Sequence, residues 1–332
     1  MSKSANQGVS VITGASGFIG GRLRDALLDE GWVVVALTRK GSPAAKRGRS
    51  VEVDYTDIAG LKRVFEQERP ELVFHVAGAT KGVHYADFQR ANVMPTRNIA
   101  TALRDAHEHV GRLLFVSSLT AYGPSTPESP LVESAERKPI EHYGRSKLEA
   151  ELVLERDFAG VLPWTIVRPP GVYGPNDVDY FELFNLAMRR LNLFFGNRDA
   201  WASMVHVDDL VRATLAAARS GATVGKGYFI CDGTPRTWSS LQAEIVAATG
   251  KRALDIDLTH ASVAVAAFFG ELLTRMDGKP RLMNRQKAIM GKQLAWTCRH
   301  DAARADFDYQ PRIALREGVA QTLEWYRSAG WL

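Results

Sequence analysis

Short apolar runs alternate with helical repeats along the first half of the chain, and this alternation restricts the fold more than any other feature. The runs are rich in β-branched residues, which is typical of strands buried on both faces of a sheet. Such strands run parallel and are connected by helices. The predicted strands are 9–13, 32–38, 50–53, 71–77, 112–118 and 164–169, and the predicted helices are one ending at Leu28, one near 57–69, one near 85–107 and one containing 142–147.

Glycines separate the first predicted strand from its helix. In TGASGFIG, residues 13–20, Gly14, Gly17 and Gly20 stand three residues apart. Gly14 can form the sharp turn, Gly17 can let the backbone approach a pyrophosphate, and Gly20 can let helix and strand pack closely. The helix N-terminus then faces the anion. A glycine-rich turn without a ligand is the alternative, but the strand–turn–helix context favours dinucleotide binding.

The alternation and this turn predict an α/β Rossmann fold with a doubly wound parallel sheet. After Pro170 the pattern loosens, with a loop at 171–180 and a helix near 180–191. A strand–helix segment at 203–218 and a strand at 227–230 indicate a return to the sheet. We assign residues 1–170, rejoined by 203–232, to the Rossmann domain, and 171–202 with 233–332 to a smaller, mostly helical lobe that binds the substrate.

Composition argues against several other classes of protein. The net charge of +5, from 42 basic and 37 acidic residues, is too small to indicate a nucleic-acid-binding protein. The two cysteines, Cys231 and Cys298, show no metal-binding spacing and favour a reducing cytoplasm. No signal peptide is evident, and the most apolar later segment, 261–273, is too short to span a bilayer. We expect a cytoplasmic protein without a resident metal.

The second predicted strand ends in basic residues. NAD-binding proteins usually carry an acidic residue there for the ribose 2′-hydroxyl, whereas an arginine accommodates a 2′-phosphate. Here Thr38, Arg39 and Lys40 end the strand, and Lys46, Arg47 and Arg49 follow closely. A solvated basic loop is the alternative. The pattern favours NADP(H) over NAD(H), with Arg39 as the main contact of the 2′-phosphate.

The segment HYGRSK, residues 142–147, places Tyr143 one helical turn before Lys147. A phenol titrates near pH 10 and is a poor general base at neutral pH. A cation on the same helix face favours the phenolate, so Lys147 is expected to lower the pKa of Tyr143. Ser117 and Ser118 end a predicted strand, where a hydroxyl could hold the substrate oxygen.

The chain resembles the extended short-chain dehydrogenase/reductase family, the NAD(P)-dependent epimerase/dehydratase group. The similar segments occur in family order over most of the chain. They are TGASGFIG (13–20), DYTD (54–57), VFHVAGAT (73–80), VSSLTAYG (116–123), YGRSK (143–147), RPPGVYGPND (168–177) and VHVDDL (205–210).

This resemblance implies roles for particular residues. Tyr143 would be the catalytic acid/base, and Lys147 would lower its pKa and hold the nicotinamide ribose. Ser118, four residues before Tyr122, would be the catalytic hydroxyl, and a homodimer would form through helices near 85–107 and 141–158. The cofactor would contact Gly14, Ser16, Gly17, Phe18, Ile19, Arg39, Asp54 (at the adenine amine), Tyr55, Val76, Ala77, Gly78, Lys147, Pro169 and Val172.

Other residues that match family positions have simpler explanations. Asn92 is expected to be structural, and His75 is expected to be a buried, hydrogen-bonded strand residue. His206 is expected to be either a core histidine at a strand end or part of the site. Asp208 is expected to be the N-cap of the following helix.

Departures from the family pattern reduce the number of activities that fit this chain. Sugar dehydratases of the family follow the catalytic hydroxyl with Asp-Glu, but Leu119 and Thr120 stand here. Many nucleotide-sugar epimerases grip the substrate diphosphate with an arginine where this chain has Ala202. The nearby Arg198 could substitute for it. A nucleotide-sugar 4-epimerase with tightly bound NAD therefore stays an alternative.

The C-terminal segments resemble those of the 3β-hydroxysteroid dehydrogenase-like branch and of bacterial reductases with lipid-like or carbonyl substrates. The apolar segment 262–273 lies near Arg275, Lys279, Arg281 and Arg285, which could line an apolar pocket or contact an anionic membrane surface. An ordinary amphipathic helix is an equally good explanation. We predict an NADP(H)-dependent oxidoreductase for a small apolar hydroxyl or carbonyl compound. A catalytically idle, cofactor-sensing regulator is the alternative outside enzymes.

Overall fold

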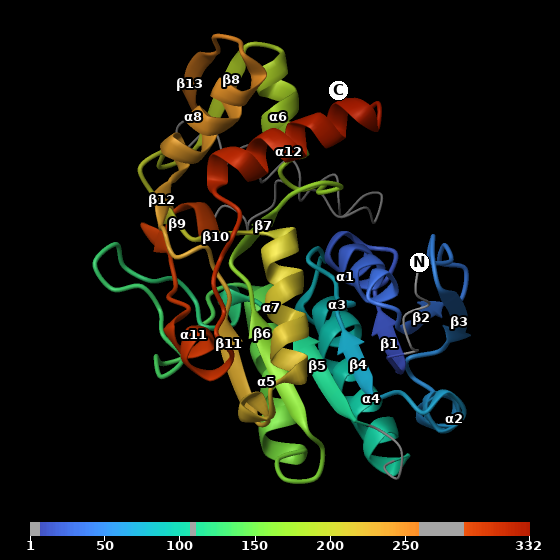
Figure 1. Ribbon diagram of the computed structural model, residues 1–332. Helices are drawn as coiled ribbons and strands as arrows, with labels where there is room; N and C mark the ends of the chain where they lie inside the picture. The colour runs from blue at the N-terminus through green and yellow to red at the C-terminus, as the bar shows by residue number, and fades with distance from the viewer. Residues whose placement is uncertain (1–6, 107–110, 259–288) are drawn as a thin grey trace.

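A seven-stranded parallel sheet forms the centre of the computed structural model, which describes residues 7–106, 111–258 and 289–332. The strand order is β11-β6-β5-β4-β1-β2-β3 (Figure 1). The predicted doubly wound sheet is thus confirmed. Its strands are β1 (Val9–Thr13), β2 (Val33–Arg39), β3 (Arg49–Val53), β4 (Leu72–His75), β5 (Arg112–Val116), β6 (Trp164–Arg168) and β11 (Lys226–Phe229).

The side on which the chain adds new strands changes at β1. This strand pairs in parallel with β2, where Val9 faces Val33, and with β4, where Ser10 faces Leu72. The first crossover therefore leads to one side of β1, and a later one leads to the other side. Loops that diverge in this way leave a crevice at the carboxyl ends of the strands, where such sheets bind their ligands.

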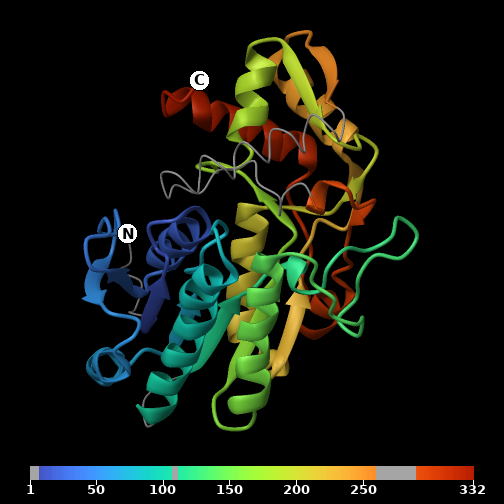
Figure 2. The same ribbon diagram turned by 180° about the vertical axis from the view of Figure 1, so that it is seen from behind.

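Helices cover both faces of the sheet. On one face, α1 (Phe18–Asp29) and α7 (Val207–Arg219) pack through side chains such as Leu27 and Leu215. On the other face, shown in Figure 2, α2 (Ile58–Glu68), α4 (Met94–Asp105) and α5 (His142–Asp157) pack through side chains such as Ile99 and Leu154. Burial on both faces explains why the strands are almost continuously apolar.

The helix predicted near 85–107 is interrupted. It consists of α3 (Tyr85–Phe88), a π-helical turn (Gln89–Val93) and α4. Single π-helical turns inside helices are frequent at functional sites. Here the turn carries the buried side chain of Asn92.

The C-terminal lobe lies beyond the carboxyl ends of the main sheet (Figure 1). Its apolar core includes Phe184, Leu241, Val319 and Tyr326. The helices here are α6 (Phe181–Met188), α8 (Trp238–Thr249) and α12 (Leu315–Ser328), while α11 (Asp301–Phe307) lies near β11. Small sheets join β7 (Gly171–Tyr173) to β10 (Met204–His206), β9 (Trp201–Ala202) to β12 (Arg236–Thr237) and β14 (Ala295–Trp296), and β8 (Leu191–Phe195) to β13 (Leu254–Leu258).

Several of these strands differ from the prediction. β7 lies in a predicted loop, and β8, β12, β13 and β14 lie where strands were not expected. These strands are short and pair with distant segments, so local periodicity does not reveal them. β10 pairs with β7 alone, whereas β11 joins the main sheet. The predicted domain boundaries stay a prediction.

The apolar segment 262–273 and the basic residues Arg275, Lys279, Arg281 and Arg285 lie outside the described residues. Within the described part of the chain, every helix is too short or too polar to cross a membrane.

Candidate active site

The glycine turn after β1 has the geometry of a phosphate site. Gly14 has φ +74°, a conformation that favours glycine, and a Cβ there would lie 2.8 Å from Ala77 N. A Cβ on Gly20 would collide with the Gly14 carbonyl oxygen. Gly17 caps α1 without a side-chain hydrogen bond, and the first turn has no acidic residue. An anion fits the positive end of this helix, so these residues suit a dinucleotide pyrophosphate.

The basic residues after β2 fall into two groups. Arg47 pairs with Asp29 at 3.0 Å and with Asp25 at 3.5 Å, and Arg49 pairs with Glu68. Arg39, in contrast, ends β2 exposed and makes no ion pair with any described residue. Its guanidinium is thus available to a ligand at the carboxyl edge of the sheet.

Asp54 and Tyr55 follow β3 at the same edge. The Asp54 carboxylate accepts hydrogen bonds from the Thr56 backbone N–H at 2.8 Å and the Thr56 hydroxyl at 2.7 Å, which lower its pKa. The Tyr55 hydroxyl donates to Leu37 O at 3.1 Å. Burial raises the pKa of Tyr55, and the nearby Arg39 opposes that rise. Arg39, Asp54 and Tyr55 therefore lie together around the ends of β2 and β3.

The loop after β4 contains Val76, Ala77 and Gly78. Asn92 holds this loop, because its side chain accepts from Ala79 N at 2.7 Å and donates to Ala79 O at 3.1 Å. A Cβ on Gly78 would lie 3.0 Å from Asn92 Oδ1 and 3.3 Å from Lys147 Nζ. The predicted structural role of Asn92 thus includes placing the loop beside Lys147.

Ser118 and Tyr143 meet where β5 ends and α5 begins. Ser118 lies after β5 and accepts from the Thr120 backbone N–H at 3.2 Å. It also accepts from the Thr120 hydroxyl at 3.0 Å. Tyr143 lies in the first turn of α5, close enough to Ser118 for the serine hydroxyl to lower the pKa of the Tyr143 phenol. The sequence predicted this pair of hydroxyl groups, and they lie together.

Lys147 lies one turn further along α5 and is buried. Its Nζ donates to Val116 O at 2.8 Å and lies 6.0 Å from the centroid of the Tyr143 ring. Burial lowers the pKa of Lys147 to about 8, although Glu151 opposes the change. The ammonium group is therefore mostly charged at neutral pH.

Burial raises the pKa of Tyr143, the Glu141 carboxylate adds to the rise, and the nearby Ser118 hydroxyl opposes it. This direction is opposite to the predicted lowering by Lys147. The main reason is that the phenol is buried, and the Glu141 carboxylate, which caps α5 at Tyr143, adds to the rise. The Lys147 ammonium is directed to Val116 O instead. At neutral pH the phenol therefore keeps its proton, which is the form that can donate it.

Pro169 and Val172 follow β6 at the carboxyl edge of the sheet. Pro169 O accepts from Leu119 N at 2.9 Å and so ties the chain after β6 to the turn that contains Ser118. Val172 in β7 packs against the same apolar cluster as Ile19 of α1. The remaining predicted residues, Ser16 and Phe18, lie in the glycine turn and the first turn of α1.

The loop after β7 reaches over Tyr143. Asp179 lies close enough that its charge also raises the pKa of Tyr143. It pairs with Lys81, from the loop after β4, at 3.5 Å. The neighbouring Asp177 is buried and accepts from Asp179 N at 2.9 Å and Tyr180 N at 3.1 Å. Loops from both halves of the molecule thus meet above the site.

Arg198, which the sequence suggested as a diphosphate clamp, is already paired with two carboxylates. It pairs with Asp255 at 2.5 Å and Asp257 at 3.1 Å, and its guanidinium lies 4.0 Å from the centroid of the Phe194 ring. These contacts hold β13 beside β8. Ala202, where many epimerases have arginine, is buried in β9.

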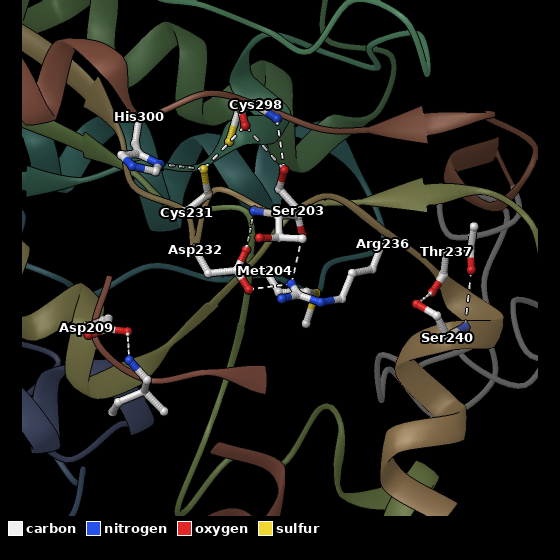
Figure 3. A network of polar contacts seen from close by, with 12 residues as sticks. Ser203, Met204, Asp209, Cys231, Asp232, Arg236, Thr237, Ser240, Cys298 and His300 are labelled. Carbon is white, nitrogen blue, oxygen red and sulfur yellow. Dashed lines mark hydrogen bonds and ion pairs between the residues drawn. The ribbon is translucent and has the colours of Figure 1, made fainter. Parts of the chain in front are cut away.

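Arg236 faces Ala202 across the β9–β12 pair but is neutralised. Figure 3 shows its guanidinium turned to Asp232, with which it pairs at 2.5 Å. The same view shows Cys231 near His300, with 3.5 Å between Sγ and Nδ1, and both cysteines are free. Among the described residues, no cluster of His, Cys, Asp and Glu could hold a metal ion.

The sequence prediction missed or misplaced some supporting residues. Thr120 holds the Ser118 hydroxyl, and Glu141 caps α5 beside Tyr143. An acidic residue just before a helix is a recognisable capping signal, so Glu141 could have been found. His206, rather than Asp208, caps α7, because its Nδ1 accepts from Asp208 N at 3.2 Å. Asp208 instead pairs with Arg22 of α1 at 2.5 Å.

Comparisons with known proteins agree with this geometry. Residues 10–231 match the family model described as "NAD dependent epimerase/dehydratase family". Ceramide reductase of Caulobacter vibrioides (strain NA1000 / CB15N) is 29% identical over 331 residues, 98% of this chain and 96% of that protein. UDP-glucose 4-epimerase of Mycolicibacterium smegmatis (strain ATCC 700084 / mc(2)155) is 27% identical over 341 residues, 96% of this chain and 98% of that protein.

A solved structure confirms the fold. UDP-glucose 4-epimerase from Thermotoga maritima superposes with a TM-score of 0.79 at 23% identity, over 97% of this chain and 99% of that chain. The family match covers the glycine turn, Ser118, Tyr143 and Lys147. The chain therefore belongs to the NAD dependent epimerase/dehydratase family, in the extended short-chain dehydrogenase/reductase group, and is an enzyme that uses a nicotinamide cofactor.

Proposed function

We propose that the protein is an NADP(H)-dependent reductase that interconverts a small apolar carbonyl compound and its alcohol. The proposal is supported by the proximity of Ser118 to Tyr143, and by that of Lys147 to Gly78 in the loop after β4. The similarity to a ceramide reductase agrees with an apolar substrate.

The nicotinamide, when bound, would supply the hydride for the carbonyl carbon. Ser118, held by Thr120, would hold the carbonyl oxygen. Tyr143 would then deliver its proton to that oxygen as charge develops. The raised pKa of Tyr143 keeps this proton in place at neutral pH. The nearby positive charge of Lys147 would stabilise the phenolate that is left.

The alternative, a nucleotide-sugar 4-epimerase, is favoured by the similarity to the mycobacterial epimerase. Such an enzyme must hold a substrate diphosphate, for which guanidinium groups are well suited. Arg198 is held by Asp255 and Asp257, and Arg236 is held by Asp232. Because Arg198 and Arg236 are both already paired, the described residues favour the reductase.

The preference for NADP(H) is proposed from Arg39. A 2′-phosphate adds negative charge at the adenosine ribose, which lies near the end of the second strand in this fold. Arg39 is exposed there without an ion-pair partner among the described residues, and the carboxylate of Asp54 is already hydrogen-bonded to Thr56.

Titration of the cofactor-free protein with NADPH and NADH, followed by tryptophan fluorescence or calorimetry, tests this preference. We expect NADPH to bind at least about tenfold more tightly, and Arg39→Ala to remove most of that advantage, since charge-assisted hydrogen bonds are among the stronger ones. Arg47→Ala is the matched control, because Arg47 is paired with Asp25 and Asp29.

The opposite result would favour the epimerase. If NAD copurifies with the protein and NADPH binds no better than NADH, Arg39 is only a surface residue. A turnover assay then shows whether the protein has any reductase activity. It uses apolar ketones with NADPH and follows the loss of absorbance of the reduced nicotinamide.

We also propose a cytoplasmic homodimer. The two free, buried cysteines are compatible with a reducing compartment. α4 and α5 lie side by side on one face of the sheet (Figure 2), and the Met94 side chain of α4 is 46% exposed. Sedimentation of the purified protein measures the oligomeric state, and a monomer at micromolar concentration would contradict the proposal.

A further inference from the structure

A chain of hydrogen bonds passes through the buried ring of His75 below the cofactor edge. Thr13, at the end of β1, has its hydroxyl oxygen 3.1 Å from Ala77 N and 2.7 Å from His75 Nδ1. On the other side of the ring, His75 Nε2 lies 3.0 Å from the Thr96 hydroxyl. That hydroxyl donates to Asn92 O at 2.7 Å. Three buried side chains thus connect the loop after β4 to the π-helical turn.

Every proton in this chain can be assigned. Asn92 O can only accept, so the Thr96 hydroxyl proton points to it, and Thr96 must accept from His75. Nε2 of His75 therefore carries a proton. Burial and the nearby Lys147 charge lower the pKa of His75 to about 3, so the ring is neutral at physiological pH. Nδ1 then has no proton and accepts from the Thr13 hydroxyl, which in turn accepts from Ala77 N–H.

The neutral ring also matters for the charge of the site. His75 stacks on Phe115 with 5.5 Å between the ring centroids. Lys147 Nζ lies 4.6 Å from the centroid of the same Phe115 ring. A positive charge on His75 would repel Lys147 in a poorly hydrated environment. The Nε2–H tautomer supplies both hydrogen bonds without adding that charge.

Both ends of the chain lead to the predicted catalytic groups. Ala77 N–H belongs to the loop beside Gly78 and Lys147. At the other end, the Asn92 side chain holds Ala79 and donates to Ser146 Oγ at 2.8 Å. The Ser146 hydroxyl donates to the carbonyl oxygen of Tyr143 at 2.7 Å. The chain therefore connects β1, the cofactor loop and the first turn of α5.

We propose that His75, fixed as the Nε2–H tautomer between Thr13 and Thr96, is a positioning residue that sets the cofactor loop relative to Tyr143. It acts through Ala77 N–H on one side and Asn92 on the other. For turnover, this inference rests on the proposed reductase function. For cofactor binding, it rests only on the family's use of a nicotinamide cofactor.

The first test is the tautomer itself. Nitrogen-15 chemical shifts of histidine distinguish a protonated ring nitrogen from an unprotonated one. With His75 assigned by comparison with a His75→Gln variant, we expect a protonated Nε2 and an unprotonated Nδ1 that do not titrate between about pH 5 and 9. A protonated Nδ1 would overturn the proton assignment.

The second test compares Thr96→Val with Thr96→Ser. Valine keeps the shape of threonine but removes the hydroxyl, which leaves the His75 N–H without its partner. Serine keeps the hydroxyl. We expect Thr96→Val to weaken NADPH binding and lower kcat by roughly tenfold each, as expected for one buried hydrogen bond, with the substrate KM unchanged. Thr96→Ser should restore both values to within about twofold.

Thermal unfolding separates positioning from stability. If Thr96→Val lowers Tm but leaves the NADPH Kd and kcat at the wild-type values, His75 is only a structural residue and the proposal is wrong. If Thr96→Val does not fold, Thr13→Val and Thr13→Ser give the same comparison from the other end of the chain. If no reductase activity is found, the cofactor Kd and the tautomer still test the role of His75. A failure of the proposed reductase function can thus be distinguished from a failure of the proposed role of His75.

Discussion

Each half of the molecule buries a carboxylate, and the two are stabilised differently. In the sheet half, Glu151 of α5 is fully buried and pairs with Arg168 at 3.0 Å and Arg137 at 3.2 Å. In the loop that leads to the C-terminal lobe, Asp177 is 2% exposed and accepts only backbone N–H groups, without an ion pair to any described residue. One carboxylate is neutralised by cations and the other is not.

This difference reflects what each half does. Buried polar networks require exact partners, so they hold the sheet half in one geometry around the cofactor. The C-terminal lobe is held instead by aromatic packing, such as Phe184 on Tyr326, and by partly exposed pairs such as Arg198 with Asp255. Exposed pairs contribute little stability. Exposed ion pairs therefore restrict the geometry of the lobe less than the buried network restricts the sheet half.

Tyr143→Phe tests the chemistry of the sheet half and should have the largest effect. Removing the proton donor is expected to lower kcat about a thousandfold, with the NADPH Kd nearly unchanged, because general acid catalysis typically contributes this much. Steady-state turnover and fluorescence titration measure the two quantities. Tyr228→Phe, which loses a buried hydroxyl bonded to Asp306 and has no predicted role in the site, is the control. Unchanged turnover in Tyr143→Phe would contradict the mechanism.

Glu151→Gln breaks the buried ion pairs of the sheet half. We expect it to destabilise the protein by about 3 kcal/mol, because the buried Arg168 loses its nearest carboxylate and keeps only Glu155 at 3.7 Å. Glu155→Gln is the control, since Glu155 is 24% exposed and should cost about 1 kcal/mol or less. Urea unfolding measures both. Equal losses would show that burial of the carboxylate does not decide the effect.

Asp177→Asn tests the other carboxylate through pH. Burial raises the pKa of Asp177 to about 7 from the ordinary 3.8. The folded state therefore binds more protons than the unfolded state between these values, and its stability falls as pH rises through this window. Asparagine imitates the protonated carboxyl, so the variant should gain about 2 kcal/mol relative to the wild type between pH 4 and 8.

Thermal or urea unfolding at several pH values measures this gain. Asp179→Asn, which changes an exposed carboxylate two residues away, should keep the pH dependence of the wild type. If Asp177→Asn also keeps the wild-type pH dependence of stability, burial does not raise the pKa of Asp177. Asp177 would then not differ from Glu151 in the way described above.

The sheet half was predictable because its signals are local. The apolar runs marked each strand of the main sheet, and the glycine spacing marked the turn that carries Gly14 and Gly20. The strands of the lobe were not predictable in this way. β13 pairs with β8 across about sixty residues, and β14 pairs with β9 across a larger separation, so their partners are not visible in either segment alone.

The sequence by itself determined the fold class and the residues that meet at the carboxyl edge, because parallel strands bring their ends together wherever the helices between them lie. It did not determine the electrostatics. Only the tertiary structure decided that Arg198 is held by Asp255 and Asp257, and that Lys147 is directed to Val116 O. It also decided that His75 has one tautomer between Thr13 and Thr96. These properties depend on burial and on partners distant in the sequence, which no local pattern records.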